Sequence, residues 1–305
     1  MKRITKLFLV AAIVLFAGSA FAQDMTKAGE VYQKATEAYQ AGNEMEAVAG
    51  FKEALSIAKE AGDEGIEMVE GCKDMIPKIL LSAAGKYVAA KDYAKAEETY
   101  NSALAAAKEY GKDALAKSAE DNLAKLPLQQ GADALNAGDF AGAAALFEKA
   151  TEKNPGNSNA FLYLAMANEK AGNLDAAEAA YKKAGELGNE KANAAMSQMF
   201  VSNANKALKE NKLKDAISLA ERALAMGPNP SASQIAGMAA YKSSSWAKAA
   251  NHLKNAPSSP QTTYIIASCY EKAGNKGQAC AFYKKIQNDG KFGPTAKAKI
   301  KNLGC

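Results

Sequence analysis

The stretch GNLDAA at residues 172–177 decides the fold, because its pattern returns along most of the chain. The pattern is a turn residue, most often Gly, then a polar residue, usually a large apolar residue, and an Ala three positions further on. Copies begin at residues 42, 91, 138, 172, 211, 244 and 274, with successive spacings of 49, 47, 34, 39, 33 and 30. Seven copies at such spacings predict a tandem array of helical hairpins.

Each position of the pattern has a physical role in such a hairpin. Gly at the turn accepts the left-handed backbone that ends a helix, and a following Asn or Asp can cap the next helix. The small Ala lets two helix axes approach closely. Pro155 and Pro228 stand where second helices should end. Because Ala, Lys and Glu are abundant and alternating β-branched runs are missing, we predict an all-α protein.

The copies resemble the tetratricopeptide repeat, a helix–turn–helix unit of about 34 residues. The resemblance covers about residues 27–290. In one copy, Phe161, Leu164, Ala165, Gly172, Ala177, Tyr181 and Ala184 occupy the repeat's usual aromatic, apolar and small positions. The resemblance implies an α solenoid, a right-handed superhelix of about seven repeats, which binds proteins in its concave groove without catalysing a reaction.

The repeats and the charge pattern predict four segments. These are a signal peptide at residues 1–22, acidic repeats with extended helices at 23–126, further repeats at 127–290, and a basic C-terminal capping helix at 291–305. The extra residues in the first two spacings fall at 57–75 and 105–126, which we interpret as longer helices plus a short linker. The second boundary is placed at Leu126 and Pro127, where the sign of the charge changes.

The first 22 residues have the features of a secretory signal peptide. A basic start precedes a 12-residue apolar run from Leu7 to Gly18, and small residues predict cleavage between Ala22 and Gln23. That run is too short for a stable membrane span; an uncleaved interfacial anchor is the alternative. No Cys follows the cut, so a lipid anchor is not expected, and no later run is long enough to cross a bilayer. We expect a periplasmic protein, with secretion or peripheral attachment to the outer membrane as alternatives.

Charge is unevenly distributed along the chain. Residues 23–126 carry 13 Lys or Arg against 19 Asp or Glu, whereas residues 127–305 carry 22 against 14. The halves therefore favour salt-sensitive, head-to-tail self-association. The basic C-terminal stretch is a candidate anion-binding end, with Lys284, Lys285, Lys297, Lys299 and Lys301 as its candidate residues; the alternative is a solvated face that keeps this end soluble. Nucleic acid is not an expected partner, because no aromatic residues alternate with Arg there.

The expected binding groove is lined by outward positions of the first helices. These are Leu128, Leu135, Leu162, Tyr163, Met166, Val201, Asn205, Met238, Tyr241 and Tyr264. An apolar groove suits an amphipathic helix or an extended peptide; some of these side chains can instead pack within the superhelix. Some tetratricopeptide proteins grip acidic chaperone tails with a Lys, Asn and Arg clamp. Leu128, Leu162 and Val201 occupy the matching positions, so that activity is not expected.

The four Cys residues leave more than one pairing open. Cys269 and Cys280 flank the turn near residue 274 at similar distances, so an antiparallel hairpin places them opposite each other. Because an exported chain meets an oxidising compartment, we predict a disulfide between them. Cys280 with Cys305 is the rival pairing if the C-terminal helix folds back. Cys72 would then stay free or pair between molecules.

The sequence favours binding over catalysis. One His and no paired C-x-x-C exclude His-based triads and common zinc or redox motifs, and no nucleotide-binding or hydrolase motif is present. We expect no cofactor and no metal. The predicted function is a non-catalytic scaffold or adaptor of the cell envelope. The alternatives are an envelope polysaccharide- or lipid-binding module using the basic end, and an accessory subunit of an envelope assembly machine.

Overall fold

The computed structural model describes residues 20–305, with side chains from residue 24 onward. The chain divides into two compact units between Pro155 and Gly156. Within the first unit lie α1 (Ala20–Gln40), α2 (Glu44–Glu60), the 3₁₀ helix η2 (Gly62–Gly65), α3 (Ile66–Ala89), α4 (Tyr93–Glu109), α5 (Asp113–Asn136) and α6 (Phe140–Lys153). No β-strand occurs in the described part of the chain.

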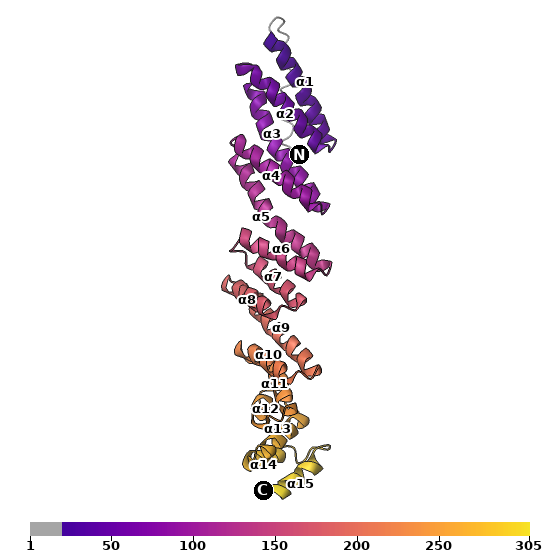
Figure 1. The fold of residues 1–305 in the computed structure, drawn as a ribbon, viewed down its shortest axis with the longest axis vertical. Coiled ribbons are helices and arrows are strands. Elements are labelled where there is room, and N and C mark those ends of the chain that lie inside the picture. Colours follow the sequence, from indigo (N-terminus) through magenta and orange to yellow (C-terminus); the bar gives the residue numbers. More distant parts are fainter. Residues whose placement is uncertain (1–19) are drawn as a thin grey trace. The chain divides into compact units, whose positions relative to one another are not determined.

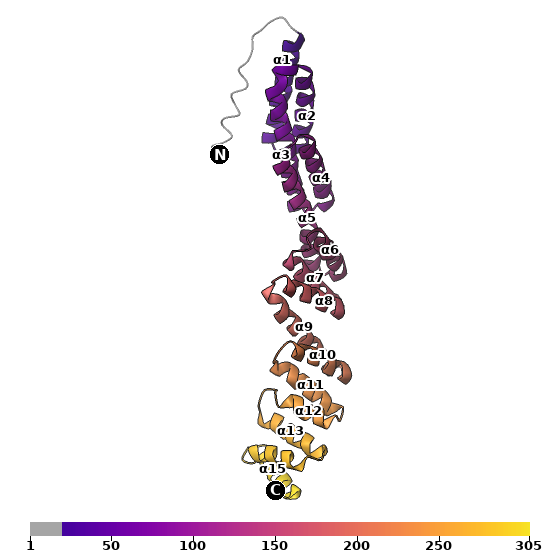
Figure 2. The ribbon, with the colours of Figure 1, turned by 90° about the vertical axis from the view of Figure 1, so that its left-hand side faces the viewer.

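The second unit has the same hairpin plan with mostly shorter helices (Figure 1). Its elements are α7 (Ser158–Ala171), α8 (Leu174–Glu186), α9 (Glu190–Lys209), α10 (Leu213–Ala225), α11 (Pro230–Lys242), α12 (Trp246–Leu253), α13 (Pro260–Lys272), α14 (Lys276–Lys285) and α15 (Gly293–Leu303). Within each unit every helix packs against the next one in the sequence, as the successive colours of Figure 2 show. The described chain therefore forms the seven predicted hairpins, followed by the predicted C-terminal helix.

The backbone explains why the turns recur. All seven predicted turn residues have positive φ, namely Gly42, Lys91, Gly138, Gly172, Asn211, Ser244 and Gly274. The residue after each turn donates its N–H to a carbonyl five residues earlier, as in Asn173 to Asn168 at 2.8 Å. This 6→1 bond is the helix-ending Schellman arrangement, which requires a left-handed residue. Three hairpins make this turn without Gly, at a cost of about 1–2 kcal/mol each.

The small residue of the pattern lies at the centre of each hairpin. Its alanines are all fully buried, namely Ala47, Ala96, Ala143, Ala177, Ala216, Ala249 and Ala279. Larger second-helix side chains, such as Phe147, fill the space beside the paired first helix. A Cβ atom added to Gly131 of α5 would lie 2.7 Å from the ring of Phe147. Close helix contact thus depends on a small residue opposite a large one.

The predicted boundary at Leu126 and Pro127 is wrong, because both residues lie inside α5. Pro127 removes one helical hydrogen bond, yet buried Leu126 keeps that part of the helix packed in the first unit. The long spacings are explained as predicted: α3 and α5 each have 24 residues, against 14 in α7. Among the described helices, none combines the length and apolar character needed to cross a membrane.

The signal-peptide prediction falls largely outside the described residues. Residues 1–19 are not described, and residues 20–23, which include the predicted cleavage site at Ala22 and Gln23, form the start of α1. The prediction of cleavage there stays a prediction.

Candidate partner-binding surfaces

Three first helices of the second unit, α7, α9 and α11, are linked by polar contacts made by capping residues. Asn189 caps α9 and donates from Nδ2 to Oδ1 of Asn159 on α7 at 3.1 Å. Asn229 caps α11 and donates from Nδ2 to Oγ of Ser197 on α9 at 3.4 Å. The capping side chain of each helix thus also fixes that helix beside the preceding one. The result is a face built from α7, α9 and α11, which we call the first-helix face.

Two large apolar side chains project from α7 on this part of the molecule. Tyr163 is 38% exposed and Met166 is 36% exposed, and they are the most exposed large apolar residues of the second unit. They are three residues apart in a helix, so they are neighbours on one side of it. Ala165 and Ala167, the sequence neighbours of Met166, are fully buried and hold α7 in the core. Exposed apolar side chains on a firmly packed helix are suited to binding a partner.

The other predicted groove residues are less available. Leu162 and Val201 pack against the core of α7–α11, and Met238, Tyr241 and Tyr264 pack against the core of α11–α15. Asn205 is exposed on α9. Leu128 and Leu135 are half-buried on α5 in the first unit. The exposed part of the apolar wall expected from the sequence is therefore reduced, in the second unit, to Tyr163 and Met166.

The predicted anion-binding lysines differ in whether an acidic side chain already pairs with them. Lys284, Lys285, Lys297 and Lys301 are exposed, whereas Lys299 forms an ion pair with Glu271 at 2.7 Å. Lys285 also lies over the ring of Phe282, 4.4 Å from the ring centroid. Lys299 therefore serves to attach α15 to α13, and the remaining lysines are the ones available to an anion.

Glu271 is a polar junction that the sequence analysis missed. Its carboxylate accepts hydrogen bonds from Lys299 and, at 2.7 Å, from the hydroxyl of Tyr283. Burial alone would raise the pKa of Glu271, but these two donors outweigh burial and lower it. Burial and the hydrogen bond to Glu271 together raise the pKa of Tyr283. The junction thus connects three helices through one charged group.

The same pairing recurs 102 residues earlier. Tyr181 of α8 donates to Glu169 of α7 at 2.8 Å, again across twelve residues. Burial, followed by this hydrogen bond, raises the pKa of the Tyr181 hydroxyl. The signal for these pairs is present in the sequence as a Glu late in a first helix and a Tyr in the second. It becomes visible only when the repeats are aligned on their turns.

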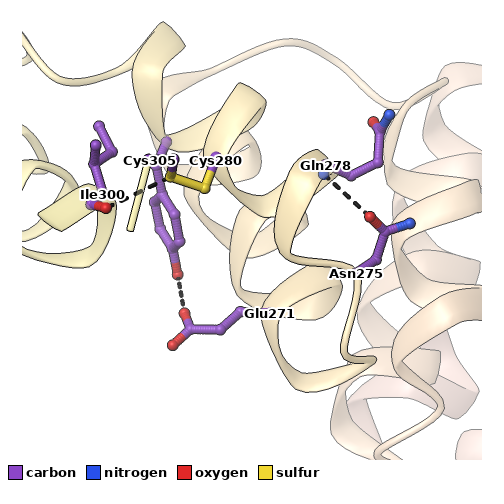
Figure 3. The surroundings of a disulfide bond; sticks show 7 residues. Glu271, Asn275, Gln278, Cys280, Ile300 and Cys305 are labelled. Carbon is purple, nitrogen blue, oxygen red and sulfur yellow. Dashed lines mark hydrogen bonds between the residues drawn. A yellow bond between two sulfur atoms is a disulfide. The ribbon is translucent and has the colours of Figure 1, made fainter. Parts of the chain in front are cut away.

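The predicted Cys269–Cys280 disulfide is wrong. Cys280 is joined to Cys305, with their Cα atoms 6.2 Å apart (Figure 3). Helix α15 packs on α14 and brings the chain end back to Cys280, while Cys269 is a fully buried free thiol in the core. Burial raises the pKa of Cys269 to about 11 and that of Cys72, also buried and free, to about 12. Neither buried thiol is placed to react with an outside group.

Other chemistry is sparse in the described part of the chain. A pocket of about 320 Å³ lies at the start of α2, but Glu44 and Lys86 in its lining form an ion pair with each other. From residue 20 onward, no three His, Cys, Asp or Glu side chains gather in a way that would hold a metal ion.

Two family models match separate parts of the chain. Residues 128–190 match the family model described as tetratricopeptide repeat, and residues 209–286 match the model for subunit 3 of the anaphase-promoting complex, cyclosome. No curated protein matches the chain significantly.

Solved structures of tetratricopeptide proteins are similar to this chain at low identity. One from Parabacteroides merdae has 14% identity and a TM-score of 0.30, covering 93% of this chain and 100% of its own. A thermophilic one from Thermus thermophilus has 20% identity and a TM-score of 0.26, covering 59% of this chain and 98% of its own. The TPR domain of P58(IPK) has 12% identity and a TM-score of 0.29, covering 91% of this chain and 97% of its own.

Proposed function

We propose that the chain, whose residues 128–190 match the tetratricopeptide repeat model, is a non-catalytic scaffold that binds a protein segment on its first-helix face. The observation that carries the proposal is the exposure of Tyr163 and Met166, one helical turn apart on α7. Both side chains belong to a helix whose other side is fixed in the core. A surface organised in advance lowers the ordering cost of association.

The size of this apolar patch defines the partner. Two exposed anchors on one helix suit a short segment with one or two apolar residues and polar flanks, such as one face of an amphipathic helix. Asn205, exposed on α9, offers an amide donor and acceptor to such flanks. A long, wholly apolar partner would find too little apolar surface, because Leu162 and Val201 are already packed inward.

The proposed location is the periplasm. The support is the signal-peptide pattern of residues 1–22, with a basic start, an apolar run and small residues before Gln23. The full-length gene product should be processed, and the N-terminal sequence of the purified protein should begin at Gln23. Recovery of unprocessed chain from the cytoplasmic fraction would contradict the location without affecting the proposal on binding.

The test of binding compares matched variants in a capture experiment. Protein purified after export is immobilised, exposed to detergent-solubilised envelope from the native organism, and eluted with increasing salt followed by denaturant. A specific protein retained through high salt should be lost from Met166→Asp, because a charge in an apolar contact is strongly unfavourable. Tyr39→Asp is the control, since Tyr39 has a similar exposed fraction of 36% but lies on α1. Equal loss from both variants, or from neither, contradicts the proposed site.

A further inference from the structure

The C-terminal end of the second unit has a large excess of positive charge. Residues 242–305 contain eleven Lys and only two acidic residues, Glu271 and Asp289. Glu271 is held by Lys299 and Tyr283, and Asp289 accepts the backbone N–H groups of residues 291 and 292. Glu271 also interacts electrostatically with Lys272, so these two carboxylates leave most of the positive charge of this end without compensation.

Most of these lysines have no acidic partner. Lys248 pairs with Glu221 and Lys299 with Glu271. The other nine are exposed and form no ion pair, namely Lys242, Lys254, Lys272, Lys276, Lys284, Lys285, Lys291, Lys297 and Lys301. Unpaired charge at this density attracts an anionic partner and speeds its association.

Aromatic rings lie beneath part of this charge. Tyr241 and Trp246 flank the α11–α12 turn, with ring centroids 5.5 Å apart in an edge-to-face pair. Lys272, at the end of α13, places its ammonium group 4.1 Å from the centroid of Trp246 and 5.4 Å from that of Tyr241. We call Tyr241, Lys242, Trp246, Lys272 and Lys276 the Lys–Trp surface. It offers ammonium groups and partly buried aromatic rings together.

A segment with the complementary properties lies in the first unit. Around the junction of α2 and α3, the exposed residues Glu60, Asp63, Glu64 and Glu67 have no ion-pair partner in the described part of the chain. Among them stands Ile66, which at 57% exposure is the most exposed large apolar side chain of the described residues. We call residues 60–67 the acidic turn. It carries four negative charges around one apolar side chain.

The acidic turn has a fixed shape. Gly62 has φ of 61°, a left-handed conformation that favours Gly. A Cβ atom on Gly65 would lie only 1.9 Å from the carbonyl oxygen of Ala58, so the turn packs directly on the backbone of α2. The carboxylates and Ile66 are therefore presented by a turn with little freedom to rearrange, which lowers the cost of docking.

We propose that the acidic turn of one copy docks on the Lys–Trp surface of a second copy. Charge complementarity selects this occupant, because both surfaces belong to the same chain and have opposite charge. Apolar complementarity agrees, since Ile66 has the size and character to contact the rings of Trp246 and Tyr241. The contact joins two different surfaces of identical chains. Such an interface is heterologous, and it adds copies head to tail unless a ring closes.

The proposal uses neither Tyr163 nor Met166, so its test is independent of the proposed scaffold function. Molar mass is measured by light scattering or sedimentation over a range of protein concentration, at about 20 mM and about 500 mM salt. The mass should rise with concentration at low salt and fall to that of a monomer at high salt. Monomer at every concentration in low salt overturns the proposal. A salt-dependent contact within one chain would leave the mass unchanged.

Charge reversal identifies the two surfaces. In the first variant Glu60, Asp63 and Glu64 each become Lys; in the second, Lys242, Lys272 and Lys276 each become Glu. Either variant alone should associate at least about tenfold more weakly at low salt, because like charges then face each other. An equimolar mixture should recover association, since the reversed turn of one variant matches the reversed surface of the other. Recovery in the mixture also shows that both variants are folded.

The control is Lys206→Glu with Lys209→Glu, which changes the charge of two exposed lysines on α9 that form no ion pair. It should associate as the original chain does. Failure of the mixture to recover association overturns the proposal. Binding to immobilised heparin tests the rival occupant, an anionic polymer. If the protein stays monomeric and binds heparin only when its Lys–Trp surface is intact, the partner of that surface is an anionic polymer and the proposal is overturned.

Discussion

Cys280 of α14 is joined to Cys305, the residue that ends the sequence, and this bond closes a segment with a sequence separation of 25. The closed segment includes α15, which packs on α14 and places Ala296 in the core of the last hairpin. Helix α15 therefore covers the end of that hairpin. The disulfide keeps that cover attached.

Removing the disulfide should destabilise the C-terminal hairpin. Under non-reducing conditions Cys305→Ser should lower the free energy of unfolding by about 3 kcal/mol, because the unfolded chain regains the entropy of an open loop. Chemical denaturation monitored near Trp246 measures the loss. Cys72→Ser is unsuitable as a control because Cys72 is buried, so the original chain under reducing conditions serves instead. If reduction leaves the free energy of unfolding of the original chain unchanged, the disulfide does not stabilise the C-terminal hairpin and the prediction is contradicted.

The Tyr283–Glu271 bond should contribute to stability through its hydroxyl group. Tyr283→Phe should cost about 1–2 kcal/mol, since it removes a hydrogen bond to a charged group and leaves the ring in place. Tyr39→Phe should cost nothing measurable, because Tyr39 is exposed and its hydroxyl makes no hydrogen bond. Equal stability of the two variants in urea denaturation would show that the Glu271 junction contributes nothing.

The same junction predicts how stability depends on pH. The pKa of Tyr283 is raised in the folded state, so its contribution is complete below the ordinary tyrosine pKa of 10.0 and is lost as the pH rises above it. The pKa of Glu271 is lowered, so its contribution is complete above the ordinary value of 4.5 and is lost as the pH falls. The free energy of unfolding, measured by denaturation across the acidic and alkaline pH ranges, should fall in each of them. Tyr283→Phe should reduce the alkaline loss, and an unchanged alkaline slope would contradict this assignment.

The non-Gly turns predict a gain in stability. Ser244 has φ of 60°, a strained value for a residue with a side chain. Ser244→Gly should stabilise the chain by about 0.5–1 kcal/mol, because relief of this strain exceeds the added freedom of the unfolded chain. The adjacent Ser243 has φ of −85°, so Ser243→Gly should bring no gain. Thermal unfolding of the two variants side by side decides the matter, and a stabilising Ser243→Gly would refute the explanation.

Close packing predicts opposite effects for two helical glycines. A Cβ atom at Gly237 of α11 would lie 2.5 Å from Cγ of Leu253, whereas one at Gly277 of α14 would meet nothing within 4 Å. Gly237→Ala should therefore cost about 1–3 kcal/mol through overpacking, and Gly277→Ala should gain up to about 1 kcal/mol from helix propensity. A neutral Gly237→Ala in denaturant titration would mean that the hairpin relaxes more than its packing suggests.

The hairpins were predictable because their signals are local. A turn residue, a cap and an Ala three positions later are read within a few residues, and all seven turns lie where the pattern places them. The prediction failed where the outcome depends on distant packing. Pro127 does not end α5, because Leu126 is buried against neighbouring helices. Cys280 pairs with Cys305 because α15 returns to α14, which no spacing within the hairpin reveals.

The binding surface was only partly predictable for the same reason. Helical periodicity identifies which side chains project from the same face of a first helix. It does not show how much of each side chain the next helix covers. Leu162 and Val201 are partly covered, whereas Tyr163 and Met166 remain exposed. The charges of the acidic turn and of the Lys–Trp surface can be read from the sequence. The exposure of Ile66 and the contact of Lys272 with Trp246 are known only from the fold.

Site-specific crosslinking tests the scaffold proposal most directly. A photoreactive amino acid is introduced at position 166 of α7, and at position 39 of α1 as the matched exposed position, and crosslinks are formed in living cells. Position 166 should yield one dominant adduct with another protein, and Tyr163→Asp in the same chain should abolish it. Absence of an adduct at position 166, or the same adduct from both positions, would contradict a binding site on the first-helix face.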